Sequence, residues 1–212
     1  MISKDYLYAI IFMAIFGVIG WLNLFAAENV TDYEFNKPPL KDFLHELIPP
    51  ISFTAPNIFV TPIIVYFFIK FMWVNPNIVS YYCILATILF AIRIITFTVT
   101  QAPPPQDKNN PWRKDNCKKH VLRHIGFEFG KTDNTCVDYM FSGHAINSLM
   151  PAVFFWLFNP NILENSIITI LAVINLVLIS AARLHYTSDV IIGAVLSILT
   201  PLALPISMIW HT

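Results

Sequence analysis

Two histidines and one aspartate have the types and spacing that chemistry on a phosphate group would need. His144 follows Ser142 and Gly143, and His185 stands four residues before Asp189. A carboxylate one helical turn from an imidazole lies beside it, fixes its tautomer and stabilises its protonated form. The other ring nitrogen can then act as a base, a nucleophile or a metal ligand.

Two arginines accompany these groups. Arg183 comes two residues before His185, and Arg93 lies inside an apolar run. Arginine is the preferred bidentate partner of phosphate oxygens. The glycine before His144 lets the backbone approach a ligand closely, and the amides at a helix start suit an anion. Together these residues favour phosphoryl chemistry on a lipid headgroup.

A zinc site is one alternative use of the same residues. Its ligands would be His144, His185, Asp189 and Asp138, which are residue types that bind zinc. The neighbouring arginines argue against it, because paired cations beside the site would repel a metal ion.

Plainer interpretations also exist for single residues. Arg93 could reach the membrane interface with its long side chain, and Arg183 could serve as an interfacial anchor. His45, His120 and His124 fall in loops and are expected to be solvated.

The composition indicates what kind of protein must position these groups. Of the 212 residues, 56% are apolar and 12% are charged, whereas a soluble domain carries roughly 25% charged residues. The 13 basic and 13 acidic residues cancel, so the chain lacks the excess positive charge that a nucleic-acid-binding protein uses to attract its partner.

Three cysteines are too few for a disulfide scaffold. Cys117 and Cys136 could pair if their loop is in an oxidising compartment, and Cys83 is expected to be a packing residue.

Six mostly apolar runs are long enough to cross a bilayer as helices, which takes about 20 residues. We predict one domain over residues 1–212, an all-α bundle of six transmembrane helices with long loops over residues 28–57 and 101–138. The first run could instead be a cleaved signal peptide. The predicted helices cover residues 6–27, 56–73, 78–100, 139–158, 164–182 and 187–210.

Alternating helix directions bring the chemically interesting residues to one face of this bundle. The loops after the first, third and fifth helices share that face, and the termini lie on the other. Three separate segments supply these residues, one with Arg93, one with His144 and one with Arg183, His185 and Asp189, and all of them lie near that face. Topology alone therefore predicts that they converge at one membrane depth.

Four motifs resemble signatures of the sphingomyelin synthase family, a branch of the type 2 phosphatidic acid phosphatase (PAP2) superfamily. Residues 136–144 (CVDYMFSGH) resemble its C-x-D-Y-x-x-S-G-H motif, and residues 183–190 (RLHYTSDV) resemble its R-x-H-Y-T-x-D-V motif. Residues 93–103 (RIITFTVTQAP) look like its signature near the end of the third helix, and residues 38–42 (PPLKD) are similar to its P-P-L-x-D element. The four occur in the expected order on the expected elements.

Some features of the wider superfamily are missing. Ile179 stands where PAP2 proteins usually carry an arginine, and the K-x6-R-P motif is absent. Both departures agree with the sphingomyelin synthase branch. The chain is shorter than typical members and has no extension before its first helix, so an additional regulatory or sorting domain is expected to be absent.

The resemblance implies a six-helix PAP2-like fold and a phosphotransferase that needs no metal or cofactor. His185 would attack the phosphorus of a phospholipid headgroup to form a phosphohistidine, with Asp189 orienting its ring. His144 would protonate the departing diacylglycerol oxygen and then accept the proton of the incoming hydroxyl. The implied substrate-binding residues are Arg93, Arg183, Ser142, Gly143, Asp138 and Tyr186.

Three functions are compatible with these residues. The favoured one moves a phosphocholine, phosphoethanolamine or phosphoinositol headgroup from a phospholipid donor to ceramide or diacylglycerol. The alternative is a PAP2-type lipid phosphatase with water as the acceptor. A non-catalytic lipid-binding or membrane-organising protein is disfavoured, because the residues of the catalytic set are intact.

The charge distribution and the resemblance disagree on orientation. Most basic residues lie in the loops on the site face and only Lys4 and Lys70 on the other, which by the positive-inside rule predicts a cytoplasmic site. The resemblance implies a lumenal or extracellular site with both termini in the cytosol. We follow the resemblance, because loops that bind headgroups need basic residues for that purpose and the rule fits short loops best.

Overall fold

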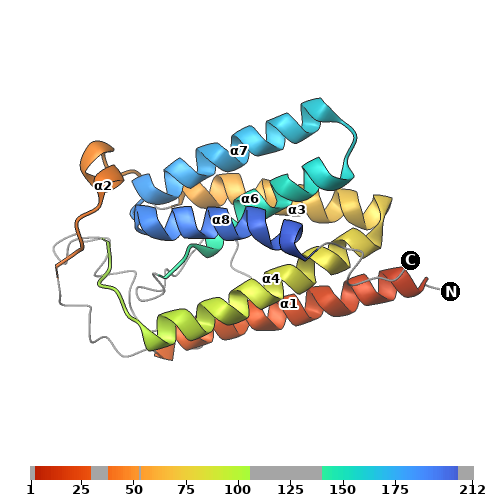
Figure 1. Cartoon of the computed structure of the whole chain (residues 1–212), viewed down its shortest axis with the longest axis horizontal. Coiled ribbons are helices and arrows are strands. Elements are labelled where there is room, and N and C mark those ends of the chain that lie inside the picture. Colours follow the sequence, from red (N-terminus) through yellow and green to blue (C-terminus); the bar gives the residue numbers. More distant parts are fainter. Residues whose placement is uncertain (1–2, 30–37, 53, 106–139, 205–212) are drawn as a thin grey trace.

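Helices are the only regular structure in the described part of the chain, residues 3–29, 38–52, 54–105 and 140–204 of a computed structural model. This confirms the predicted all-α class (Figure 1). The helices are α1 (Lys4–Asn29), α2 (Phe43–Leu47), α3 (Ala55–Val74), α4 (Pro76–Val99), α6 (Gly143–Phe158), α7 (Ile162–Ala181) and α8 (Thr187–Ala203).

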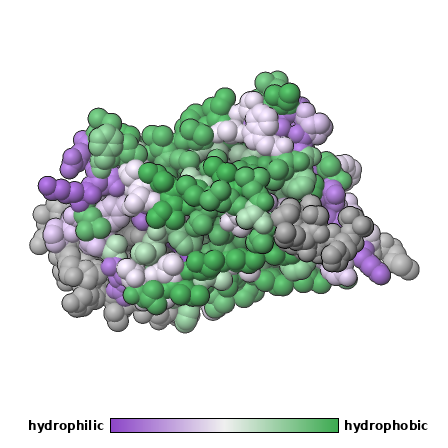
Figure 2. Space-filling model, in the orientation of Figure 1, coloured by the Kyte–Doolittle hydropathy of each residue, from purple (hydrophilic) through white to green (hydrophobic). Residues whose placement is uncertain are grey.

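The helix lengths indicate an integral multi-pass membrane protein. Helices α1, α3, α4 and α7 are long and apolar enough to cross a membrane. Helices α6 and α8 are also apolar but have 16 and 17 residues, fewer than the roughly 20 that a crossing takes. The described residues therefore contain four candidate spans, and six crossings remain a prediction. Figure 2 shows hydrophobic residues over the middle of the visible face, with hydrophilic ones towards the ends.

The long helices alternate in direction along the chain. In Figure 1, α1 and α4 run side by side, and α3, α6, α7 and α8 form a second group. The ends of α1, α4 and α7 lie at the same end of the bundle as the starts of α3, α6 and α8. This arrangement agrees with the alternation expected from the sequence and brings α2 to that same end.

The helix bounds differ from the predicted ones by up to four residues, except that α8 ends at Ala203 rather than at residue 210, and residues 205–210 lie outside the described part. Two of the differences have identifiable reasons. Helix α6 begins at Gly143 rather than at residue 139, because Ser142 is its N-cap and accepts a hydrogen bond from the backbone N–H of Ala145 at 3.1 Å. Helix α2 lies within the predicted loop over residues 28–57. It begins after Asp42, whose side chain accepts from the backbone N–H of His45 at 3.1 Å.

An aromatic cluster joins α3, α4 and α6. Phe67, Tyr82 and Phe154 are fully buried, and the ring centroid of Phe67 lies 4.6 Å from that of Tyr82 and 5.7 Å from that of Phe154. Buried aromatic rings at these separations contribute beyond their buried area. Cys83 is buried and free, which confirms it as a packing residue. The cluster fixes the helices that carry the site residues.

Candidate active site

The two predicted catalytic histidines meet at the end of the bundle. His144 is the second residue of α6, and His185 lies in the turn between α7 and α8. Their ring centroids are 6.2 Å apart. The backbone N–H of Ser142 donates to the carbonyl of Asp189 at 3.0 Å, so the start of α6 is bonded directly to the first turn of α8. The predicted convergence of these segments is therefore present in the structure.

His185 and Asp189 face one another, although not on one helix as the spacing argument assumes. His185 precedes α8, and Asp189 is the third residue of that helix. The side chain of Asp189 folds back to accept from the backbone N–H of Tyr186 at 3.2 Å. This brings its Oδ2 to 3.8 Å from Nδ1 of His185, with both side chains buried. Hydrogen bonds of catalytic groups are often long in unliganded enzymes and shorten in the complex.

Asn57 at the start of α3 holds His144. Its Oδ1 lies 3.0 Å from Nε2 of His144. An amide oxygen can only accept, so Nε2 carries the hydrogen in this contact. Sequence patterns did not indicate Asn57, since its only signal is a polar side chain near the start of an apolar run.

Ser142 and Gly143 shape the turn before His144. Ser142 is fully buried and caps α6. A Cβ at Gly143 would lie 3.3 Å from the ring of Phe90 and 3.7 Å from the guanidinium carbon of Arg93. The absence of a side chain at Gly143 therefore lets α4 pack tightly behind this turn.

Arg93 lies behind that turn in a buried position. Its Nε donates to the carbonyl of Phe141 at 2.8 Å, and its Nη1 donates to the side-chain oxygen of Asn23 on α1. Its guanidinium also lies 5.7 Å from the ring centre of Phe97. Arg93 thus joins α1, α4 and the turn that carries His144, and its predicted contact with phosphate oxygens remains a prediction.

Arg183 takes a strained position at the end of α7. Its φ is 58°, in the left-handed region that favours glycine. The guanidinium donates to the carbonyls of His45 and Ile48, the latter at 2.8 Å, and so reaches the α2 segment. Burial lowers the pKa of Arg183, although Asp42 opposes the shift. Its predicted role in holding phosphoryl oxygens stays a prediction.

Tyr186 and Asp138 are the remaining predicted substrate-binding residues. The hydroxyl of Tyr186 donates to the carbonyl of Pro103 at 2.7 Å and accepts from the backbone N–H of Leu40 at 3.0 Å. It therefore links three segments at the site. Asp138 lies outside the described residues, as do both loop cysteines, Cys117 and Cys136.

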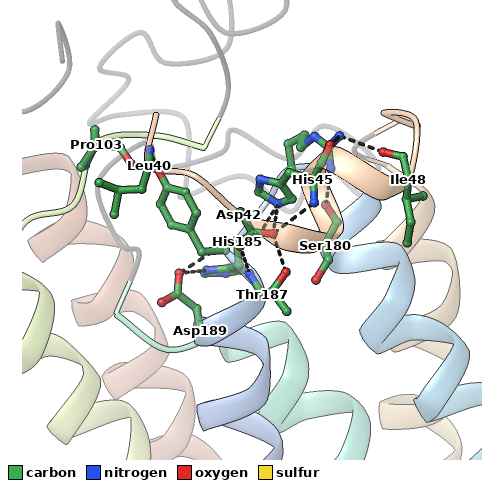
Figure 3. A network of polar contacts seen from close by, with 11 residues as sticks. Leu40, Asp42, His45, Ile48, Pro103, Ser180, His185, Thr187 and Asp189 are labelled. Carbon is green, nitrogen blue, oxygen red and sulfur yellow. Dashed lines mark hydrogen bonds and ion pairs between the residues drawn. The ribbon is translucent and has the colours of Figure 1, made fainter. Parts of the chain in front are cut away.

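The expectation that His45 is solvated is wrong. Its side chain is 10% exposed, and its Nε2 lies 3.2 Å from the carbonyl oxygen of His185. Burial lowers the pKa of His45, although the charge of Asp42 opposes the shift. Figure 3 shows His45 among the polar contacts around His185. His120 and His124 lie outside the described residues.

Asp42 also belongs to this network. Its Oδ1 and Oδ2 accept from the hydroxyl and the backbone N–H of Thr187, each at 2.6 Å (Figure 3). Burial raises the pKa of Asp42, but these hydrogen bonds and the one from the His45 backbone outweigh it, and the pKa lies below its ordinary value. Asp42 is therefore a carboxylate that occupies the N-terminus of α8.

The zinc alternative finds no support in the described ranges. No three histidine, cysteine, aspartate or glutamate side chains within them are grouped to hold a metal ion. His144, His185 and Asp189 are arranged as a pair of imidazoles with one carboxylate behind His185.

One protein family and several known proteins are similar to part of this chain. Residues 135–204 match the family model described as PAP2 superfamily C-terminal. A phosphatidylethanolamine:ceramide ethanolaminephosphotransferase of Trypanosoma brucei brucei is 30% identical over 119 residues, 55% of this chain and 36% of that protein. Phosphatidylcholine:ceramide cholinephosphotransferase 1 of Caenorhabditis elegans is 26% identical over 177 residues, 74% of this chain and 37% of that protein. The match thus spans little more than a third of the length of each of these relatives.

The family match contains the two histidines and the carboxylate of the predicted catalytic set. Ser142, His144, His185 and Asp189 all fall within residues 135–204. The resemblance stated from the motifs is thereby confirmed. Residues 135–204 match the PAP2 superfamily C-terminal model, and the chain is distantly similar, over part of its length, to ceramide phosphoethanolamine and phosphocholine transferases.

Proposed function

We propose that this protein is a membrane phosphotransferase that moves a phospholipid headgroup phosphate onto ceramide or diacylglycerol through a phosphohistidine on His185. The observation that carries the proposal is the pair of imidazoles with ring centroids 6.2 Å apart, one of them backed by a carboxylate at 3.8 Å. A nucleophile and a proton donor on opposite sides of one reacting atom need such a separation.

The relatives support a lipid acceptor. Their names specify phosphatidylethanolamine or phosphatidylcholine as the donor and ceramide as the acceptor. Four long apolar helices in the described part of the chain support a membrane location, where such lipids are found. Ceramide is therefore the first acceptor to test, and phosphatidylethanolamine and phosphatidylcholine are the first donors.

The reaction has two displacements in this proposal. A ring nitrogen of His185 attacks the phosphorus, and the bond to the diacylglycerol oxygen breaks while His144 gives that oxygen a proton. The acceptor hydroxyl then attacks the phosphorus, the phosphorus–nitrogen bond breaks and His144 takes the hydroxyl proton. Asp189 keeps the His185 ring oriented, and Arg183 and Arg93 supply positive charge for the phosphoryl oxygens. Ser142, Gly143, Asp138 and Tyr186 complete the proposed substrate site.

The test uses the purified full chain in liposomes. Labelled phosphatidylcholine, phosphatidylethanolamine and phosphatidic acid are each offered with and without ceramide or diacylglycerol, and the products are followed by mass spectrometry. We expect a phosphosphingolipid and an equal amount of diacylglycerol. A phosphorylated His185 peptide should accumulate when the acceptor is left out.

The same experiment tests the PAP2-type phosphatase alternative. Free phosphate or free phosphorylated headgroup, formed at the same rate with and without ceramide, would identify water as the acceptor. The matched control is His185→Ala, which should insert into the membrane normally and form no product. Activity in that variant would contradict the proposed site.

We also propose a membrane arrangement for this function. The whole chain, residues 1–212, would form one PAP2-like domain with six crossings, and the site face would be lumenal or extracellular with the termini in the cytosol. A glycosylation acceptor inserted beside Pro38, on the site face, should be modified. One inserted between α3 and α4 should not be modified, and the reverse pattern would contradict this orientation.

A further inference from the structure

The element at residues 38–42 is the one predicted motif that the proposed reaction does not use. With the short helix α2 it lies over the turn between α7 and α8 (Figure 3). Besides the hydrogen bond from the Leu40 N–H to Tyr186, three side chains connect the two segments. Asp42 accepts from Thr187, Arg183 donates to the carbonyls of His45 and Ile48, and His45 approaches the carbonyl of His185.

The contact of His45 falls on the peptide group that follows His185. The carbonyl oxygen of that peptide lies 3.2 Å from Nε2 of His45. Its N–H belongs to Tyr186 and donates to Asp189 at 3.2 Å. Both ends of one peptide plane are thus hydrogen-bonded, one to α2 and the other to the carboxylate that faces His185.

Fixing this peptide plane restricts the side chain beside it. The orientation of this plane sets ψ of His185. Together with φ, ψ determines the direction in which the Cα–Cβ bond of His185 points. The next backbone N–H, of Thr187, is held by Asp42 at 2.6 Å. The ring of His45 also stacks on that of Tyr186, with centroids 5.8 Å apart. The backbone around His185 is therefore held from α2 as well as from α8.

We propose that His45 is a positioning residue for His185, acting through an Nε2–H bond to the carbonyl of His185. The proposal rests on the proposed function, because it assigns His45 to the step in which His185 attacks phosphorus. A carbonyl oxygen cannot donate, so the contact requires a hydrogen on Nε2. His45 acts on the rate of attack through orientation and makes no contact with the substrate.

Two substitutions separate this hydrogen bond from packing. His45→Phe keeps an aromatic ring against Tyr186 but has no donor, and His45→Gln loses the ring but keeps an N–H that can reach the carbonyl. Glu46→Ala, at an exposed neighbouring position of α2, is the matched control. Each variant is reconstituted as the full chain, and kcat, KM for the phospholipid donor and the midpoint of thermal unfolding are measured.

We expect His45→Phe to lower kcat by about 10- to 100-fold with little change in KM, because misplacing a nucleophile affects the chemical step. His45→Gln should recover to within roughly threefold of the unmodified chain, because it restores one hydrogen bond. The control should match the unmodified chain. A normal kcat in His45→Phe, or a loss in His45→Gln as large as in His45→Phe, would overturn the proposal.

A further variant tests the proposed function independently of the role of His45. His185→Ala is measured beside the His45 variants. If His185→Ala retains activity, the proposed function fails. If it is inactive while His45→Phe is normal, only the role of His45 fails.

Discussion

Gly193 of α8 lies directly against the backbone of Ser142, the residue that caps α6. A Cβ at Gly193 would be 2.9 Å from the carbonyl oxygen of Ser142 and 3.0 Å from the Cβ of Ala145. This close approach accompanies the hydrogen bond from the Ser142 N–H to the Asp189 carbonyl at 3.0 Å. The distance between the two histidine-bearing segments is thus set by backbone contact.

Gly193→Ala should therefore push α8 away from α6. The nearest atom is a backbone oxygen, which cannot rotate aside, so we expect a loss of about 1–3 kcal/mol in the free energy of unfolding and a lower kcat. Gly17→Ala is the control, because nothing lies within 4 Å of a Cβ there and alanine favours a helix over glycine. Thermal unfolding in detergent compares the two variants. Equal unfolding midpoints for the two variants would show that the structure accommodates a methyl group at residue 193 without losing stability, and would contradict the prediction.

Asp189→Asn should separate the structural use of this side chain from its proposed catalytic use. An amide oxygen can still accept from the Tyr186 N–H, so the start of α8 should be kept. The substitution removes the negative charge beside His185. We expect kcat to fall by several orders of magnitude, because a histidine that loses its carboxylate partner is no longer held in the reactive tautomer. Activity assays are paired with circular dichroism. Near-normal turnover would exclude Asp189 from the catalytic set.

Asn57→Asp should change the pH dependence of the reaction. It places a carboxylate within about 3 Å of His144 and so favours the protonated form of the ring, which is the form that donates a proton in the proposed reaction. We expect the alkaline limb of the pH–activity profile to move to higher pH, and Asn57→Ala to lower activity without that movement. Ser52→Ala, an exposed position before α3, is the control. Superimposable profiles for all variants would show that Asn57 does not act on His144.

Acidification should weaken the contact between α2 and the α7–α8 turn. Burial lowers the pKa of His45 from its ordinary value of 6.5, so the unfolded chain binds more protons than the folded one just below that value. This contribution to stability is present above pH 6.5 and falls as the pH drops towards the folded pKa. The charged groups that face His45 are Asp42, Arg183 and Asp189.

Thermal unfolding across this pH range measures the effect. His45→Gln does not titrate, so its unfolding midpoint should depend less steeply on pH below 6.5 than that of the unmodified chain. Identical slopes for the two proteins would mean that other groups carry the pH dependence.

Lys70→Ala should leave turnover nearly unchanged. Lys70 pairs with Glu164 at 2.5 Å, and the hydroxyl of Tyr66 bonds the same carboxylate at 2.6 Å. This cluster joins α3 and α7 near the end of the bundle opposite His144 and His185. Partly exposed pairs contribute about 1 kcal/mol or less, so the unfolding midpoint should fall only slightly. A large loss of kcat in this variant would show that the opposite end affects the chemistry.

Much of the framework follows from local patterns. Apolar runs and breaks predict the long helices to within a few residues, because helix formation in a membrane depends on the hydropathy of the segment itself. Alternation of direction then places His144 and His185 at one end. The start of α6 is less well predicted. The apolar pattern extends before Gly143, but the side chain of Ser142 caps the helix there.

The sequence by itself determined the class of the protein and the chemistry available to it. The apolar composition requires a membrane protein, and the motifs at residues 136–144 and 183–190 contain the histidines and the carboxylate. These are properties of residue type and spacing, which need no tertiary contact to be recognised.

The tertiary structure decided which groups hold those histidines. Asn57 meets His144 and His45 meets the backbone of His185, across 87 and 140 positions of the chain. Arg93 and Arg183 bind carbonyl oxygens of other segments. Such pairings depend on how the helices pack and on where the short helix α2 docks. The residue pattern within a single segment cannot predict them.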